Sequence, residues 1–243
     1  MTRLLRGKRG VSPIELGDRQ PRIAAAGSGA KRTDSRRVFG ERRGRLRACR
    51  GLGYGEHMQL EAVREELSSY RTADQTEAAY VARMLELSRA NAACERSHFA
   101  PGHFTASAFV LSPDKRDVIL IHHKKLGIWV QPGGHVEATD AELLSAARRE
   151  VAEEVGLGEL DLLPGEPSAS ALFDVDIHTI PARKTEPAHE HFDVRFAFVA
   201  RTRDFARTEE VADVRWVPLG EVARVTSDAS VLRAVQKLQA RLG

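Results

Sequence analysis

The segment from Arg149 to Leu157, which reads REVAEEVGL, constrains the fold of this chain more than any other. It places the glutamates Glu150, Glu153 and Glu154 at positions i, i+3 and i+4, and on a helix these three side chains share one face. Like charges at this spacing repel one another, so a helix that keeps them indicates a bound cation. Carboxylate oxygens are ligands that suit Mg²⁺ or Mn²⁺.

Glutamate-rich helix faces are also common on solvated surfaces, so the glutamates alone do not establish a metal site. In this chain the glutamates are accompanied by glycines and an arginine at defined positions. Gly133 and Gly134 precede the helix across a short polar turn, and Arg149 stands directly before the first glutamate. Gly156 follows the last one at the position where a helix ends in the left-handed conformation. The combination favours a built metal site over a solvated face.

This loop and helix resemble the signature of the Nudix hydrolases, G-x5-E-x7-R-E-U-x-E-E-x-G-U, in which U is aliphatic. The second half matches at every fixed position, namely Arg149, Glu150, Val151, Glu153, Glu154, Gly156 and Leu157. The first half departs from the signature, because the sixth residue after Gly134 is Asp140 and eight residues separate it from Arg149. Glu142, seven positions before Arg149, is the other acid available to orient that arginine.

The resemblance implies an α/β fold, a Nudix-type α/β/α sandwich with a mixed sheet, over residues 100–243. It implies hydrolysis of the pyrophosphate bond in a nucleoside diphosphate linked to another moiety, with Mg²⁺ or Mn²⁺ as cofactor. The implied metal ligands are the Gly133 carbonyl and the side chains of Glu150, Glu153 and Glu154. Arg149 is expected to pair with an acid of the loop rather than to clamp phosphate. Glu153 is the first choice for the general base, a role that differs among family members.

A second group of polar residues lies at His189, His191 and Asp193. In a strand these side chains point to one face, and Glu190 and Phe192 point to the other. The first three can bind a metal or contact phosphate, or they can form a polar strand face near the surface. Because the family often takes a fourth acidic metal ligand from outside the motif, Glu190 and Asp193 are both candidates.

Further substrate contacts are expected beside the paired glycines. Gly134 and His135 can face the pyrophosphate, although His135 can equally be a solvated turn residue. Trp129 lies a few residues before the motif, where it can stack on a base; an aromatic side chain in a short strand is more often part of the core. We therefore expect a small, nucleotide-type substrate, and the sequence does not identify which one.

The first 57 residues differ in composition from the rest of the chain. Residues 1–56 hold 15 Lys and Arg against 5 Asp and Glu, a net charge of +10, so the remainder carries −7. This stretch has no sustained hydrophobic period and is typical of disorder. It can be a nucleic-acid-binding arm, an organelle-targeting segment, or upstream sequence included by a start assigned too early. We favour the last alternative, with Met58 as the working start, because helical patterning begins directly after it.

Composition also indicates the cellular compartment and the partners to be expected. Two cysteines among 243 residues imply no disulfide framework, which favours a reducing compartment and a cytoplasmic protein. No apolar run approaches the length needed to span a membrane. We expect no membrane partner and no nucleic-acid partner for the domain, and a homodimer remains open.

The hydrophobic pattern of residues 58–99 predicts a helical N-terminal segment that packs on the catalytic domain. Its helices are expected at Gln59 to Tyr70 and from the capping-box-like Asp74-x-x-Glu77 to about Ala90. The motif helix is expected from Asp140 to Val155, and a last helix runs from a cap at Ser227 or Asp228 to Leu242. The expected strands are His103 to Leu111, Asp117 to His122, Ile128 to Gln131, Ser170 to Ile180, Glu190 to Ala200 and Val211 to Val217.

Two rival functions come from other classes. A catalytically silent Nudix-like module would sense a nucleotide, but such modules usually lose a motif glutamate and all three are present here. A nucleic-acid-binding protein would use the basic arm, and removing residues 1–57 would then abolish binding to DNA or RNA.

Overall fold

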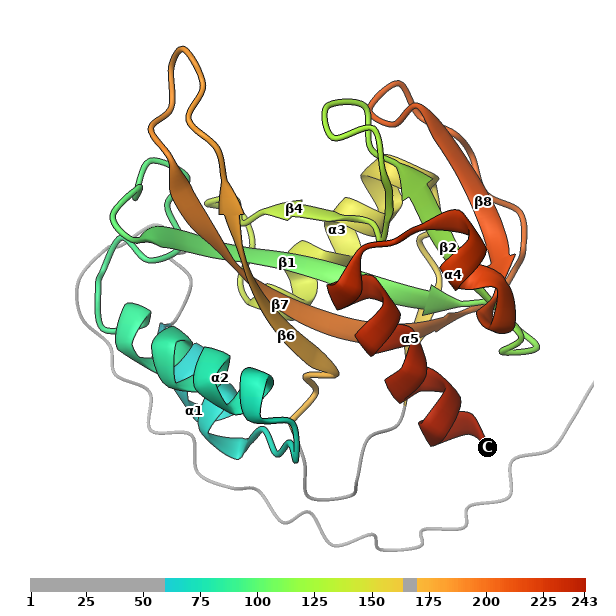
Figure 1. Ribbon diagram of the computed structural model, residues 1–243, viewed down its shortest axis with the longest axis horizontal. Coiled ribbons are helices and arrows are strands. Elements are labelled where there is room, and N and C mark those ends of the chain that lie inside the picture. The colour runs from blue at the N-terminus through green and yellow to red at the C-terminus, as the bar shows by residue number, and fades with distance from the viewer. Residues whose placement is uncertain (1–59, 164–169) are drawn as a thin grey trace, which may run out of the picture. The chain divides into compact units, whose positions relative to one another are not determined.

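The computed structural model describes residues 60–163 and 170–243, and the expectations for residues 1–57 lie outside this range. Five α-helices, one short 3-10 helix and eight strands make up the described part (Figure 1). In chain order they are α1 (Leu60–Ser69), α2 (Gln75–Leu87), β1 (Gly102–Leu111), β2 (Asp117–His122), β3 (Trp129–Val130), β4 (Gly133–His135), α3 (Leu143–Val155), β5 (Leu160–Leu162), β6 (Asp174–Ile180), β7 (His189–Ala200), β8 (Asp213–Pro218), η1 (Leu219–Glu221), α4 (Val222–Val225) and α5 (Ala229–Leu242).

The strands form one mixed sheet around β1. β1 pairs in parallel with β7 along its whole length, while β2 and β4 pair with β1 antiparallel at different points. β6 and β5 extend the sheet from β7, and β3 and β8 extend it from β2. The expected mixed sheet is therefore confirmed. β4 pairs with Thr105, Ala106 and Ser107 in the middle of β1, so the paired glycines lie directly beside the central strand.

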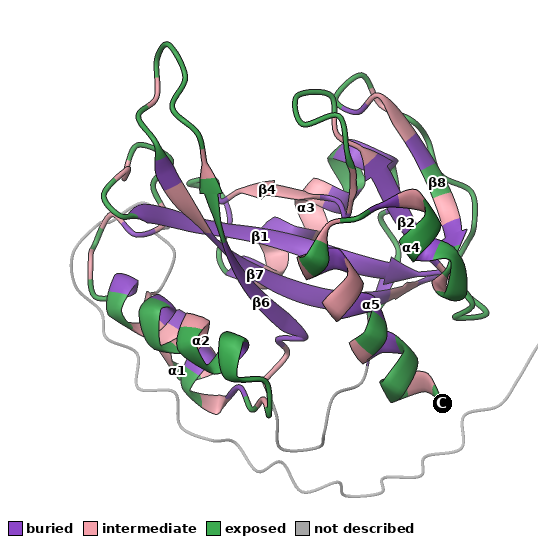
Figure 2. Ribbon diagram, viewed as in Figure 1, coloured by how far each residue is buried: buried purple, intermediate pink, exposed green. Residues whose placement is uncertain are grey.

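Helices cover both faces of this sheet, which makes the predicted α/β/α sandwich. Phe104, Ala106 and Ala108 of β1 point to one face, where they join a core that takes residues from α1, α2 and α3. Phe109 and Leu111 point to the opposite face and pack against α4 and α5. Burial follows the strands at the centre of the sheet (Figure 2). Within the described residues no helix has the length and apolar character needed to cross a membrane.

The N-terminal pair of helices begins as the sequence predicts, with one difference. Asp74 caps α2, its carboxylate accepting hydrogen bonds from the backbone N–H groups of Thr76 at 2.8 Å and Glu77 at 3.0 Å. Glu77 does not complete a capping box. Its carboxylate is buried and accepts hydrogen bonds from the Tyr70 hydroxyl at 2.6 Å and the Lys237 ammonium at 2.9 Å. The glutamate thus joins α2 to α5.

A group of buried charges lies at the centre of this contact. Arg195 of β7 is fully buried and bonds Asp193 at 2.7 Å, Asp174 at 3.3 Å and Asp176 at 3.2 Å. Arg233 of α5 also bonds Asp174, at 2.9 Å. Since a buried charge is tolerated only when it is paired and hydrogen-bonded, these contacts fix α5 against β6 and β7.

Two of the longer elements begin later than the sequence predicts, and two short strands were not predicted. The motif helix begins at Leu143 rather than Asp140, because the Ser145 hydroxyl donates to the Glu142 carbonyl at 2.6 Å and so closes the first turn there. The strand expected from Ser170 begins only at Asp174. β4 and β5 were not predicted, since three residues are too few to show a period of two.

Candidate active site

The motif helix α3 and the strand β4 build the candidate site. The Glu154 carboxylate is buried and accepts a hydrogen bond from the Gly133 N–H at 2.9 Å. Glu150 lies one turn earlier, over Gly134, and Glu153 is the most exposed of the three glutamates, with 43% of its side chain accessible. Gly156 ends the helix in the left-handed conformation with φ of 69°, as its position predicts.

The glycines are required because the backbone has no room for a side chain. A Cβ on Gly133 would lie 2.2 Å from the Ser107 Cβ of the neighbouring strand. A Cβ on Gly134 would lie 2.7 Å from the carboxyl carbon of Glu150. Both distances are far below van der Waals contact, so the glycines let β4 reach β1 on one side and the acidic helix on the other.

Arg149 holds the loop and the helix together. Its guanidinium donates to Asp140 at 3.1 and 2.9 Å, which is a bidentate pair, and to the backbone carbonyl of His135 at 2.8 Å. It also donates to Glu150 at 3.0 Å and Glu153 at 2.8 Å. The acid that orients Arg149 is therefore Asp140, and Glu142 instead caps the helix. A guanidinium engaged in this way positions the acidic side chains, as the resemblance implies.

The acidic side chains are held where ionisation is costly. Burial raises the pKa of Glu154 to about 8, against the lowering effect of the Gly133 N–H, and burial raises the pKa of Glu150 to about 6 despite the adjacent Arg149. A carboxylate that is buried without a full set of partners resists taking up charge. A divalent cation would supply the missing partner.

Glu210 is a further acid that the sequence did not single out. Its side chain is exposed, and its negative charge adds to the rise in the pKa of both Glu150 and Glu154. The segment that carries it passes the end of α3, where the Thr208 hydroxyl donates to the Glu154 carbonyl at 3.3 Å. In the sequence it is one of two adjacent acids, Glu209 and Glu210, and nothing in that pattern links it to the motif helix.

The structure does not favour the two candidates expected as the fourth acidic ligand. Glu190 forms an ion pair with Arg83 of α2. Asp193 is buried and accepts hydrogen bonds from Ser107 at 2.7 Å, Thr105 at 3.1 Å and Arg195 at 2.7 Å. Both carboxylates are engaged within the protein, and Glu210 is a further acid whose charge acts on Glu150 and Glu154. Because Asp193 is buried, its carboxylate is also not exposed to contact a substrate.

The predicted strand face of His189 and His191 gathers three more imidazoles. His191 lies with its ring centre 4.9 Å from that of His103, 5.0 Å from that of His135, and 5.4 Å from that of His178. Burial, together with the neighbouring imidazoles, lowers the pKa of His191 to about 2, and burial together with the charge of Arg96 lowers the pKa of His135 to about 4. His135 is therefore a half-buried neutral imidazole and not a solvated turn residue.

Trp129 has one ring face occupied. The Arg215 guanidinium lies 3.9 Å from the ring centre, and the side chain also packs against the core beside α5. The structure thus supports the core alternative for this residue.

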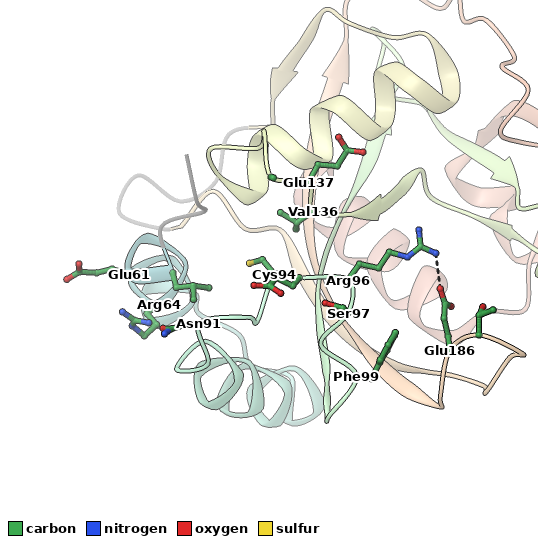
Figure 3. Close-up of a pocket in the computed structure, with 14 residues that line it drawn as sticks. Glu61, Arg64, Asn91, Cys94, Arg96, Ser97, Phe99, Val136, Glu137 and Glu186 are labelled. Carbon is green, nitrogen blue, oxygen red and sulfur yellow. Dashed lines mark hydrogen bonds and ion pairs between the residues drawn. The ribbon is translucent and has the colours of Figure 1, made fainter. Parts of the chain in front are cut away.

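A pocket of about 1310 Å³ lies next to the motif loop. Figure 3 shows it between the residue pair Val136 and Glu137 of that loop and the segment around Cys94, with Arg96 and Glu186 joined across one side. The Arg96 guanidinium donates to the Glu186 carboxylate at 3.0 Å. The pocket has charged groups of both signs along its lining, and it opens within a few residues of His135.

The fold and the acidic site together define a member of a known class. A family model described as NUDIX domain matches residues 101–235. The chain therefore belongs to the NUDIX family and is a hydrolase of that family, as the motif predicts.

Solved structures of the same fold are similar to this chain at low identity. A NUDIX-family hydrolase from Clostridium perfringens is 24% identical, with 57% of this chain and 97% of that chain covered and a TM-score of 0.43. The NUDIX domain of Shewanella oneidensis NrtR, solved with ADP ribose, is 19% identical over 58% and 88% of the chains, with a TM-score of 0.42. The Escherichia coli dihydroneopterin triphosphate pyrophosphohydrolase is 18% identical over 55% and 92%, with a TM-score of 0.42. No curated protein matches the chain.

Replacing Gly134 by alanine is expected to displace the Glu150 carboxylate, since the new methyl group would occupy its space. Hydrolysis should fall steeply. The midpoint of thermal unfolding should change much less, because only the end of the flexible Glu150 side chain has to move. Gly220→Ala is the matched control, as no atom lies within 4 Å of its added Cβ. Equal activity in the two variants would contradict the steric role of Gly134.

Glu154→Gln is expected to stabilise the metal-free protein, and to do so more at pH 8 than at pH 5. The folded-state pKa of Glu154 is raised from 4.5 to about 8, so the unfolded chain loses this proton first and the fold loses stability as pH rises between these values. Thermal unfolding in the presence of a chelator measures the effect. Glu153→Gln is the control, because its side chain is 43% exposed. A stability gain of the same size at both pH values would contradict the raised pKa.

Proposed function

We propose that this protein hydrolyses the pyrophosphate bond of a nucleoside diphosphate linked to another moiety, and that it requires Mg²⁺ or Mn²⁺. The observation that carries the proposal is the position of Glu154 and Glu150, whose carboxylates lie against the backbone of Gly133 and Gly134. Family membership supports hydrolysis; the arrangement of carboxylates supports the metal and the diphosphate.

The residues present fit such an ion. Glu150, Glu153 and Glu154 are hard oxygen donors on one helix, and the Gly133 carbonyl stays a predicted further ligand. Glu154 is buried and has a raised pKa, which is what a carboxylate shows when its cation is the partner it lacks. A bound divalent ion would neutralise phosphate oxygens and lower the pKa of an attacking water.

The chain itself supplies position and proton transfer. Arg149 orients Glu150 and Glu153 through its hydrogen bonds at 3.0 and 2.8 Å. Glu153 is proposed as the general base, and its 43% exposure supports this because it is the motif glutamate best placed to meet a water from solvent. Gly134 and His189 remain proposed substrate contacts. A carboxylate in hydrogen-bonding reach of the water can take its proton.

The proposed domain organisation follows from the same elements. The catalytic domain spans residues 100–243, and residues 58–99 form a helical segment that contributes Val63, Leu67 and Met84 to its core. Residues 1–57 are proposed to be dispensable for hydrolysis. The substrate is proposed to be a small nucleotide-type molecule.

Hydrolysis of a panel of candidate substrates tests the function. ADP-ribose, dinucleoside polyphosphates, oxidised nucleoside triphosphates, nucleotide sugars and nucleotide coenzymes should be assayed with Mg²⁺, with Mn²⁺ and with a chelator. Turnover of at least one class with a divalent ion, and none with the chelator, is the expected result. Binding of a nucleotide without turnover under both metals would overturn the proposal in favour of a silent sensing module.

A chain that begins at Met58 separates hydrolysis from any role of the basic extension. It should retain the same substrates and a similar turnover. Loss of hydrolysis in this shortened chain, with its thermal unfolding unchanged, would show that the extension belongs to the catalytic machinery.

A further inference from the structure

Three strands bring one imidazole each to a single point on the sheet. His103 comes from β1, His135 from β4 and His191 from β7. One ring nitrogen of each lies within 4.8 Å of those of the other two. Because nitrogen atoms bound to a tetrahedral zinc stand about 3.4 Å apart at Zn–N lengths of about 2.0–2.1 Å, small side-chain rotations would close this set around an ion.

Two of these nitrogen atoms have no partner. The Nε2 atoms of His103 and His191 are buried and form no hydrogen bond, and the whole side chain of His103 is buried. Buried polar atoms are nearly always paired, so each exception calls for an explanation. Here both unpaired atoms belong to the same three-residue cluster.

The hydrogen bond on the other side of the His103 ring prepares it for a metal. Its Nδ1 lies 3.2 Å from the His98 carbonyl, and a carbonyl only accepts, so Nδ1 carries the proton and Nε2 keeps its lone pair. A metal-bound histidine typically donates its second N–H to a carbonyl or carboxylate in this manner. His103 is therefore oriented as a ligand in the absence of any ion.

The neighbouring histidines have the same arrangement. His189 Nδ1 lies 2.9 Å from the Pro187 carbonyl, and His178 Nδ1 lies 3.3 Å from the Asp176 carboxylate. Their rings pack 5.3 and 5.4 Å from the ring of His191. They surround the cluster, whose ligand atoms come from His103, His135 and His191.

We propose that His103, His135 and His191 bind a transition-metal ion, Zn²⁺, at a site separate from the acidic one. Neutral imidazoles suit Zn²⁺, whereas Mg²⁺ prefers oxygen ligands. Asp193, two residues along the strand from His191, is already bonded to Arg195, Ser107 and Thr105, and Asp176 is paired with Arg195. The donor set is therefore all nitrogen, unlike that of the motif glutamates.

The position of His135 gives the ion a structural role. Its backbone carbonyl accepts from Arg149 at 2.8 Å, while its ring packs 5.2 Å from that of His103. β4 meets β1 over only three residue pairs. A metal bound to all three strands would anchor β4, and with it the paired glycines beside the acidic helix.

Zinc titration of the full chain tests the proposal. The protein is first stripped with a chelator and then kept in excess Mg²⁺, which occupies carboxylate sites and leaves imidazoles free. Titration against a metallochromic chelator should show one tightly bound Zn²⁺ per chain. His103→Gln combined with His191→Gln should lose it. His122→Gln, a histidine of β2 outside the cluster, should keep it, and so should Glu150→Gln combined with Glu154→Gln.

Loss of the bound Zn²⁺ in the glutamate variant, or its retention in the double histidine variant, would overturn the proposal. X-ray absorption of the zinc-loaded wild-type chain gives a result that does not depend on the variants folding. At least three imidazole ligands are expected. A zinc shell made of oxygen atoms would show that the ion occupies the acidic site, and would overturn the proposal without affecting the proposed hydrolysis.

Discussion

Glu153→Gln is expected to lower the turnover of hydrolysis by about 10²- to 10⁴-fold, the range that one positioned proton acceptor contributes. Glutamine keeps the volume of the side chain but cannot accept the proton of water. The side chain is 43% exposed and makes one charged contact, to Arg149 at 2.8 Å, so the fold should survive. Steady-state kinetics at saturating Mg²⁺, together with thermal unfolding, measures both effects.

Glu159→Gln serves as the control, since this exposed glutamate follows the helix and lies outside the motif. It should leave turnover and unfolding unchanged. If Glu153→Gln retains near-normal turnover with Mg²⁺ while Glu150→Gln and Glu154→Gln do not, then Glu153 is not the general base. If all three variants retain turnover, the metal-dependent mechanism is wrong.

Arg195→Met is expected to reduce the free energy of unfolding by about 3–5 kcal/mol, the cost of removing one partner from a buried ion pair. Arg195 is fully buried and bonds Asp174, Asp176 and Asp193. Methionine fills part of its volume but leaves three buried carboxylates with too little positive charge beside them. Urea unfolding at neutral pH measures the loss.

The control is Arg201→Met, at the end of the same strand. Arg201 pairs with Asp161 at 2.8 Å on the surface, where both side chains are about 60% exposed, and exposed pairs contribute little. Its free energy of unfolding should match the wild type within error. A similar loss in both variants would show that burial of the Arg195 group does not set its contribution.

The motif helix shows what a sequence can predict without a structure. The end of the helix at Gly156 could be predicted because glycine readily adopts positive φ. The common orientation of Glu150 and Glu154 could be predicted from the helical period of about 3.6 residues. The choice between Asp140 and Glu142 could not be made in this way. It depends on how the turn folds back, and the extra residue in that turn lets Asp140 reach Arg149.

Glu77 and Glu210 mark the limit of such prediction. The spacing of Asp74 and Glu77 is that of a capping box, yet Glu77 bonds Lys237, which is 160 residues away. Glu210 lies in a loop with no pattern, and its charge acts on the motif glutamates because that loop passes the end of α3. Contacts between distant segments leave no local period, so the sequence could not place them.

The histidines lie between these cases. Alternation along a strand correctly placed His189, His191 and Asp193 on one face, because side chains of a strand alternate. It could not show that His103 and His135 come from two other strands to meet them. Nor could it show that Asp193 is withdrawn into bonds with Arg195 and Ser107.

The parallel pairing of β1 with β7 has a consequence for how the chain is made. Partner residues such as Gly102 and Glu190 stand 88 positions apart, and every residue of β1 ends up buried. During synthesis this apolar strand leaves the ribosome long before its main partner exists. Closing so long a loop is slow, and an apolar strand is prone to aggregate until its partner strand has paired with it. The pairing of β1 with β7 therefore cannot begin until residues 190–199 have been made.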